Sequence, residues 1–255
     1  MRRAVVVNAD DLGLSRDINE GIFAGLELGA ISDVSILIHA PNAFEAVGRL
    51  RVIGLKSVGL HINLDERLGW SSPGRERLSR PELMALLDTP AFLKRCREDA
   101  RMQIEQCIAC GLEITHIDTH HHVHGFFPLF TEFLGLAKEY RIPAMRHSRN
   151  GYTLTTRQPI PFDPSRCRRM EELMRQEGVF FCSAMVEGAG KLEEIPSFPA
   201  ELVVHPSRGA DPWRKREMET LTSPGFQSCL EAVDVRIVSF KDLVGRGSEP
   251  GGTFS

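Results

Sequence analysis

Side chains that bind metal ions and move protons gather in a few short segments of this 255-residue sequence. One segment holds five of the nine histidines within nine residues, around Asp118: His116, His120, His121, His122 and His124. Two adjacent aspartates, Asp10 and Asp11, follow an apolar run near the N-terminus, and His61 and His205 also lie at the ends of apolar runs. Histidine-rich tracts are typical of metal binding. We therefore interpret the histidine segment, residues 116–124, as a metal site.

These residue types suit one kind of chemistry. Imidazole nitrogens and carboxylate oxygens together bind zinc and other divalent ions, and manganese or magnesium become more favourable as the oxygen share grows. Such an ion lowers the pKa of a bound water to about 7, which makes a nucleophile at neutral pH. A carboxylate beside a metal ligand can take the proton of this water, which gives Asp10 and Asp11 different roles. His205 is then the candidate by position for protonating a leaving amine.

Other interpretations of single residues stay open. Adjacent aspartates also favour a turn or the start of a helix, where they interact with the helix dipole. His61 taken alone is more typical of a core or surface histidine. In an extended stretch His120, His122 and His124 would share one face, but this geometry does not select the ligand. His122 and His124 are therefore candidates for contacting substrate or orienting the ligands.

The elements that must position these side chains alternate along the chain. Short apolar runs predict strands at Ala4–Asn8, Val34–His39, Ser57–Leu64, Ile114–Asp118, Ala144–Arg146, Val179–Ala184, Glu201–His205 and Ile237–Ser239. Helical periodicity predicts helices from Ser15 to about Leu28, at Ala43–Leu50, in segments from Pro81 to Cys110, from Pro128 to Tyr140 and at Arg166–Gln176. Loops are predicted around Ser71–Gly74 and at Asn150–Pro164, and Gly29 and Gly111 occupy positions that favour helix ends.

The alternation predicts an α/β fold with a parallel sheet and helices outside it. A doubly wound sheet often carries a glycine-rich phosphate turn, but the sequence has neither GxGxxG nor GxxxxGK[ST]. Reactive side chains instead follow several different strands, whose carboxyl ends meet at one mouth in a barrel. We expect a deformed TIM-like (βα) barrel as a single domain over residues 1–244, with a flexible tail at 245–255.

Composition excludes several classes of protein. The net charge of −3 gives no basic excess for binding nucleic acid. No apolar stretch approaches the roughly 18 residues of a membrane span. The N-terminal apolar run ends at Asn8 and is too short for a signal peptide, so we expect a cytoplasmic protein. The six scattered cysteines are interpreted as reduced thiols.

Four blocks of the sequence resemble the YdjC-like carbohydrate deacetylases, a family that includes chitooligosaccharide deacetylases. The blocks are Asn8–Ser15, Gly59–His61, Thr115–His124 and Val204–Pro206, and they follow the family order over the first 206 residues. The first and third blocks are long enough to be specific, whereas the other two are short.

The resemblance implies a deformed (βα) barrel and removal of acetyl groups from N-acetylated sugars. It implies one divalent ion, zinc or magnesium and alternatively manganese, bound by Asp11, His61 and His120. It also assigns Asp10 as general base and His205 as general acid.

Two departures from the family pattern concern the substrate side. Leu12 stands where the family usually has phenylalanine, and the run from Gly125 to Pro128 is one residue longer than usual. The sugar and the acetyl group that is removed are therefore left open.

Trp213 follows His205 and is a candidate wall for a sugar ring, although loop tryptophans also cover core edges or subunit contacts. Four arginines are either substrate contacts or surface charges: Arg67, Arg75, Arg146 and Arg149. Fold analogy favours a homodimer.

Three functions compete at this point. The first is a metal-dependent sugar N-deacetylase. The second is a metal-dependent amidase or esterase acting on a non-sugar acyl compound, since the same ligands and base would serve. The third is a non-catalytic, metal-dependent sugar-binding protein. The adjacent pair Asp10 and Asp11 argues against the third, because a binding protein needs no base beside a ligand.

Overall fold

The computed structural model of the chain describes residues 3–64, 80–147 and 163–247. The predicted loop at Ser71–Gly74, Trp70 and most of the loop at 150–164 lie outside these ranges, as do Arg67, Arg75 and Arg149. The described strands are β1 (Arg3–Leu12), β2 (Asp33–Ile36), β3 (Ser57–Ile62), β4 (Glu113–Thr119), β5 (Ala144–Met145), β6 (Ala184–Glu187), β7 (Ala200–Val204) and β8 (Val235–Ile237).

The α-helices follow the strands along the chain. They are α1 (Arg16–Glu27), α2 (Ala43–Val52), α3 (Arg80–Leu87), α4 (Pro90–Ala109), α5 (Phe127–Glu139), α6 (Pro164–Gln176), α7 (Pro212–Leu221), α8 (Pro224–Ala232) and α9 (Phe240–Gly247). Two 3₁₀ segments, η1 (His120–Gly125) and η2 (Ala189–Glu194), follow β4 and β6. Every predicted helix is therefore confirmed, and α7, α8 and α9 are additional.

The strands have the order β5-β4-β3-β2-β1-β7-β6, and β8 also pairs with β1. The pairs of β1 with β2, β7 and β8 are all parallel, as are β4 with β5 and β6 with β7. This parallel sheet with intervening helices confirms the predicted fold class, an α/β fold of the deformed TIM-like barrel type.

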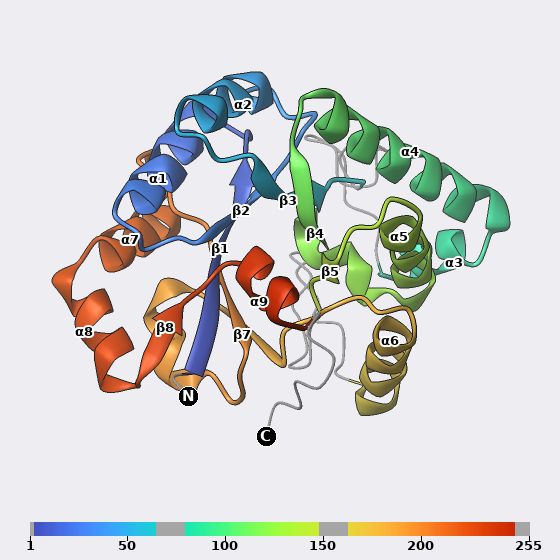
Figure 1. The fold of residues 1–255 in the computed structure, drawn as a ribbon. Coiled ribbons are helices and arrows are strands. Elements are labelled where there is room, and N and C mark those ends of the chain that lie inside the picture. Colours follow the sequence, from blue (N-terminus) through green and yellow to red (C-terminus); the bar gives the residue numbers. More distant parts are fainter. Residues whose placement is uncertain (1–2, 65–79, 148–162, 248–255) are drawn as a thin grey trace. The chain divides into compact units, whose positions relative to one another are not determined.

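The chain forms two compact units, which we describe separately. Unit 1 contains Met1–Gly59 and Cys182–Ser255, and unit 2 contains Leu60–Phe181. In unit 1, α7 lies beside α1, and α8 lies beside β8 (Figure 1). In unit 2, α5 packs on α4 and on η1. The predicted domain boundary at residue 244 stays a prediction, because residues 248–255 lie outside the described part of the chain.

Strand β1 is the buried centre of unit 1. Its residues from Val5 to Leu12 are buried on both faces, as expected for a parallel strand covered by other elements. The strand was predicted to end at Asn8, but it continues to Leu12, because Leu12 pairs with Ile36 beyond an irregularity in the β1–β2 register. The two aspartates therefore lie within the strand and not after it.

Local capping explains how α1 begins and ends. The hydroxyl of Ser15 accepts a hydrogen bond from the backbone N–H of Ile18, which satisfies a donor at the helix start. Gly29 has a φ of 67°, a left-handed conformation in which glycine is favoured after a helix. Both features agree with the sequence-based prediction.

One predicted strand is wrong. The apolar run Val179–Ala184 does not form a strand of that length; β6 begins only at Ala184. Phe180 instead makes an isolated parallel bridge with Ala144, and its backbone N–H donates to the carbonyl of Pro143. Partners outside the run therefore decided which of its residues entered the sheet, which single-segment periodicity does not reveal.

The six cysteines, all within the described ranges, form no disulfide bond. Four of them are buried: Cys96, Cys107, Cys110 and Cys182. Throughout the described ranges, every helix is too short or too polar to serve as a membrane span.

Candidate metal and catalytic site

The carboxylate pair, Asp10 and Asp11, lies at the end of β1 with both side chains buried. Asn8 donates one hydrogen bond to Asp10 Oδ1, with Nδ2 and Oδ1 separated by 2.9 Å, and another to the hydroxyl of Ser35 on β2 at 2.9 Å. This amide therefore connects Asp10 to the neighbouring strand and restricts the orientation of its carboxylate.

Asp11 has a different environment. Its φ of 69° lies in the left-handed region, and its carbonyl accepts a hydrogen bond from Leu14 at 3.0 Å. A regular strand would send adjacent side chains to opposite faces, and an irregularity of this kind redirects a side chain. The guanidinium of Arg214 on α7 donates to Asp11 Oδ2. The two aspartates thus have separate partners.

The Asn8–Ser15 motif also contains a position that only glycine fits well. Gly13 has a φ of 98°, and a Cβ added there would meet the Cα of Ala43 at 3.0 Å. Its N–H donates to Asn19 Oδ1 on α1, with N and Oδ1 2.7 Å apart. The turn that holds Asp11 is therefore tied to α1 and packs closely on α2.

His205 follows β7 in unit 1, and its ring lies between two carboxylates. Its Nε2 is 3.9 Å from Asp10 Oδ2, and its Nδ1 is 3.9 Å from Glu217 Oε2. The backbone N–H of His205 donates a hydrogen bond to the same Glu217 oxygen. The ring of Trp213 lies edge-on to the imidazole, with the centroids 5.3 Å apart. The proposed base and acid are therefore neighbours within this unit.

Burial changes the protonation of these groups. Burial lowers the pKa of His205 below its usual value, although the charges of Asp10 and Asp11 oppose this effect. Burial also raises the pKa of Glu217 to about 7, against the N–H of His205 and the charge of Arg214, which lower it. Groups that ionise near neutral pH are suited to proton transfer.

In unit 2, Asp118 on β4 forms a buried ion-pair network. Its Oδ1 lies 2.8 Å from His61 Nδ1, and its Oδ2 lies 2.7 Å from Arg146 Nη2. The Nε2 of His116 lies 3.8 Å from Oδ2. Burial by itself would raise the pKa of Asp118, but Arg146 and His61 together hold it well below its usual range. Asp118 is therefore a carboxylate at neutral pH.

This network selects one tautomer of His61. An ionised carboxylate only accepts hydrogen bonds, so the Nδ1 of His61 must donate to Asp118. The Nε2 atom then keeps its lone pair and can bind a metal. Carboxylates commonly orient metal-binding histidines in this way. The chemistry of the donor therefore fits a divalent ion.

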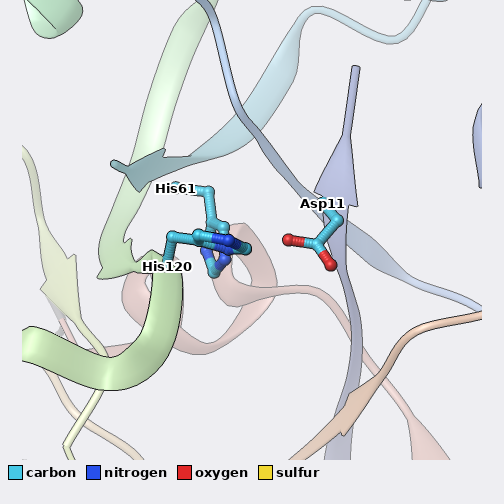
Figure 2. A group of neighbouring side chains, drawn as sticks. All are labelled: Asp11, His61 and His120. Carbon is cyan, nitrogen blue, oxygen red and sulfur yellow. The ribbon is translucent and has the colours of Figure 1, made fainter. Parts of the chain in front are cut away.

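The histidine segment turns sharply after β4. His121 and His122 have φ values of 56° and 51°, so the one-face arrangement of an extended stretch does not occur. The ring of His120 lies near that of His61, with centroids 5.5 Å apart and planes at 75° (Figure 2). His122 lies near His124, at 5.9 Å between centroids. The turn thus separates His120 from His122 and His124.

His124 is held inside unit 2 by Thr119. The Thr119 hydroxyl oxygen accepts from the backbone N–H of His124 at 3.1 Å and lies 2.7 Å from its Nδ1. Burial, followed by the charges of His122 and Arg146, lowers the pKa of His124 well below its usual value. His124 is therefore neutral at pH 7, and its predicted contact with substrate stays a prediction.

Asp11 in unit 1 and His61 and His120 in unit 2 are all buried (Figure 2). Their types, two imidazoles and one carboxylate, fit a divalent ion such as zinc.

Sequence reasoning missed four residues of these networks. Asp118 was noticed within the histidine segment but received no role. Arg146 was considered a substrate contact or a surface charge, whereas the structure buries it against Asp118. Arg214 and Glu217 carried no signal beyond their position soon after His205. Only their contacts with Asp11 and His205 identify them.

Solved structures share the fold. A protein from Enterococcus faecalis V583, described as a candidate cellobiose-phosphate cleavage protein, matches with a TM-score of 0.72 and 19% identity, over 95% of this chain and 99% of that chain. A lactam utilization protein from Thermus thermophilus matches with a TM-score of 0.52 and 15% identity, over 92% and 99%. These likenesses concern the fold alone.

Curated relatives and a family model agree with each other. A carbohydrate deacetylase of Brevibacillus brevis is 25% identical over 94% of this chain and 99% of its own length, and one of Vibrio cholerae is 24% identical over 94% and 96%. A chitooligosaccharide deacetylase of Klebsiella pneumoniae is 30% identical over 54% of this chain and 57% of its own. The family model, described as YdjC-like protein, matches residues 4–232 of this chain. The chain therefore belongs to the YdjC-like family.

Proposed function

We propose that this protein is a metal-dependent hydrolase that removes the N-acetyl group from an amino sugar. The names of the curated relatives support a carbohydrate deacetylase. The observation that carries the proposal is the different surroundings of the two adjacent carboxylates: Asp10 faces Asn8 and His205, whereas Asp11 pairs with Arg214. Two roles, base and ligand, explain this difference.

Asp11, His61 and His120 are the proposed ligands of one divalent ion, zinc or magnesium, with manganese as a further candidate. Such an ion polarises an acyl carbonyl and acidifies a water molecule when it is bound. The chain itself orients the ligands. Asp118 fixes the His61 ring, and Arg214 occupies one carboxylate oxygen of Asp11.

Asp10 and His205 carry the proposed proton transfers. Asp10 takes a proton from the attacking water, and His205 gives a proton from Nε2 to the sugar nitrogen as its bond to the acetyl carbon breaks. The products are acetate and the free amine. The 3.9 Å between Asp10 Oδ2 and His205 Nε2 would let a proton return to His205 after a small movement or through one water.

Trp213 is the proposed wall of the sugar subsite. Its side chain is 42% exposed although it lies beside His205, and an exposed aromatic face can stack on a sugar ring. His122 and His124 are proposed to contact the substrate. A homodimer and a cytoplasmic location belong to this proposal as further expectations.

The decisive experiment measures acetate release from N-acetylated mono- and oligosaccharides. Protein stripped of metal would be reloaded with zinc, magnesium or manganese, and Asp10→Ala and His120→Ala would be assayed beside the wild type. The exposed residue Asp88 on the chain between α3 and α4 offers a matched control, Asp88→Asn. We expect metal-restored release that Asp10→Ala and His120→Ala abolish and that Asp88→Asn leaves unchanged.

Two other results would contradict the proposal. Faster hydrolysis of simple acyl amides or esters than of any acetylated sugar would assign the protein to that substrate class. Tight sugar binding that Asp10→Ala leaves unchanged, with no product under any metal, would make the protein a binding protein.

A further inference from the structure

The geometry points to Glu217 as a positioning residue for His205: it holds the imidazole with Nδ1 facing its carboxylate, so that Nε2 is the atom that releases a proton. The catalytic meaning of this interaction rests on the proposed function. The interaction itself lies within unit 1 and can be measured without any turnover.

One carboxylate oxygen contacts His205 twice. Glu217 Oε2 accepts the backbone N–H of His205 and lies 3.9 Å from its Nδ1. The backbone hydrogen bond fixes the carboxylate beside His205, and the 3.9 Å separation places its charge next to Nδ1. A carboxylate in this position favours Nδ1–H over Nε2–H in the neutral ring.

The Glu217 carboxylate lies near the end of β6. A Cβ added to Gly188, just after β6, would lie 3.5 Å from Glu217 Oε1. Gly188 has a φ of 103°, and its N–H donates to the carbonyl of Val203 on β7. The carboxylate that α7 supplies therefore faces the end of β6.

Charges face His205 from three elements. Strand β1 contributes Asp10 and Asp11, Glu187 lies on β6, and α7 contributes Arg214 and Glu217. Within this set Glu217 Oε2 lies 3.9 Å from Nδ1, and Asp10 Oδ2 lies 3.9 Å from Nε2. When it is ionised, a carboxylate about 4 Å from a ring nitrogen favours the imidazolium form, which is the form a general acid requires.

The proton balance follows from this arrangement. Imidazolium carries protons on both nitrogens. When Nε2 gives its proton to the leaving amine, the proton on Nδ1 stays beside Glu217, and the ring becomes neutral without rotating. The Nε2 lone pair is then ready to receive the proton that Asp10 took from water.

The test is an NMR titration of ¹⁵N-labelled histidine, with the His205 signals assigned through a His205→Asn variant. Wild type, Glu217→Gln and Glu217→Ala would be titrated from pH 5 to 9, with and without zinc. Glu219→Gln is the matched control, because Glu219 is on the same helix but exposed. Circular dichroism would verify that each variant is folded, and Glu217→Asp tests whether a restored charge rescues the effect.

We expect Glu217→Gln to lower the pKa of His205 by about one unit. The alkaline limb of the kcat profile should shift to lower pH with it, with KM and zinc affinity unchanged. Glu217→Ala should also reduce the Nδ1–H fraction of the neutral ring, whereas Glu219→Gln changes neither quantity and Glu217→Asp restores part of both.

An unchanged pKa and tautomer of His205 in both Glu217→Gln and Glu217→Ala would overturn the inference, even if those variants lost activity. A shifted pKa in a protein that releases no acetate from any sugar would support the Glu217–His205 interaction and contradict only the proposed function. The two failures are therefore distinguishable.

Discussion

Aspartate and histidine lie close together in two regions of this protein, but the distances between their side chains differ. In unit 2, Asp118 lies 2.8 Å from His61 and 2.7 Å from Arg146, within direct hydrogen-bonding distance. In unit 1, the ring nitrogens of His205 lie 3.9 Å from Asp10 and Glu217, beyond hydrogen-bonding distance. The first set is joined by direct contacts, whereas the second is not, and we propose that the second is the one that exchanges protons with a reactant.

The difference lies in the partners rather than the residue types. Arg146 compensates the buried charge of Asp118 and keeps its pKa well below the usual range. Glu217 accepts a hydrogen bond from the backbone N–H of His205, and burial raises its pKa to about 7. The guanidinium partner therefore keeps Asp118 ionised, whereas the half-buried Glu217 has a pKa near neutrality.

The largest effect is expected at the proton-transfer region. Asp10→Asn keeps the size of the side chain but removes the base, so we expect kcat to fall by about 10²–10⁴-fold. The free energy of unfolding and the zinc affinity should change little. Steady-state acetate release, chemical denaturation and zinc titration measure these quantities. Near wild-type turnover would assign the base to another residue.

The next largest effect is expected in the fixed region. Arg146→Met leaves the buried charge of Asp118 without its cation, so we expect a loss of about 3–5 kcal/mol in the free energy of unfolding. Urea denaturation measures it, and Arg95→Met, at an exposed position on α4, is the control. The paired replacement Arg146→Met with Asp118→Leu should recover part of the loss. If Arg146→Met lowered the free energy of unfolding no more than Arg95→Met does, Arg146 would not be needed to compensate the charge of Asp118.

A smaller effect is expected on metal binding. Asp118→Asn removes the negative charge that orients the Nδ1–H of His61, so we expect zinc affinity to fall about ten- to a hundredfold. Competition with a chelator measures this affinity. Asp163→Asn, at the half-buried N-cap of α6, should leave it unchanged. An unaltered affinity in Asp118→Asn would mean that His61 needs no orienting carboxylate.

The smallest effect concerns pH and stability. The folded-state pKa of His124 lies well below the unfolded value of about 6.5, so the unfolded chain binds its proton first as the pH falls. His124 therefore lowers the free energy of unfolding below pH 6.5, by up to about 1.4 kcal/mol per pH unit. Above about pH 6.5 it has no such effect.

The comparison of wild type with His124→Gln isolates this contribution. Other groups titrate in the same window; burial raises the pKa of Asp33 to about 7, for example. We expect the difference in unfolding free energy between the two proteins to depend on pH only below about 6.5. A difference that stays constant from pH 7 to pH 5 would show that His124 is not held neutral.

The sequence predicted well whatever depends on neighbouring residues. The Ser15 cap, the glycine end of α1 and the first turn of α5 at Pro128 all follow from local capping rules, and all are confirmed. The strand–helix alternation was sufficient for the fold class. The strand at Val179–Ala184 was wrong because pairing with β5 and β7, not its own apolar pattern, decided its structure.

The residue types of the site were also visible in the sequence, because so many histidines and an aspartate pair rarely gather by chance. The resemblance also proposed roles for these residues, but the charged partners that surround them were not visible. Arg146 is 28 positions beyond Asp118, and Glu217 is 12 positions beyond His205, so no local rule connects them. Burial and these pairings decide which carboxylate is compensated and which ionises near neutral pH. The sequence by itself determined which chemical groups this protein carries, and only the tertiary structure decided which charged partner each group has, because pKa and orientation depend on neighbours distant along the chain.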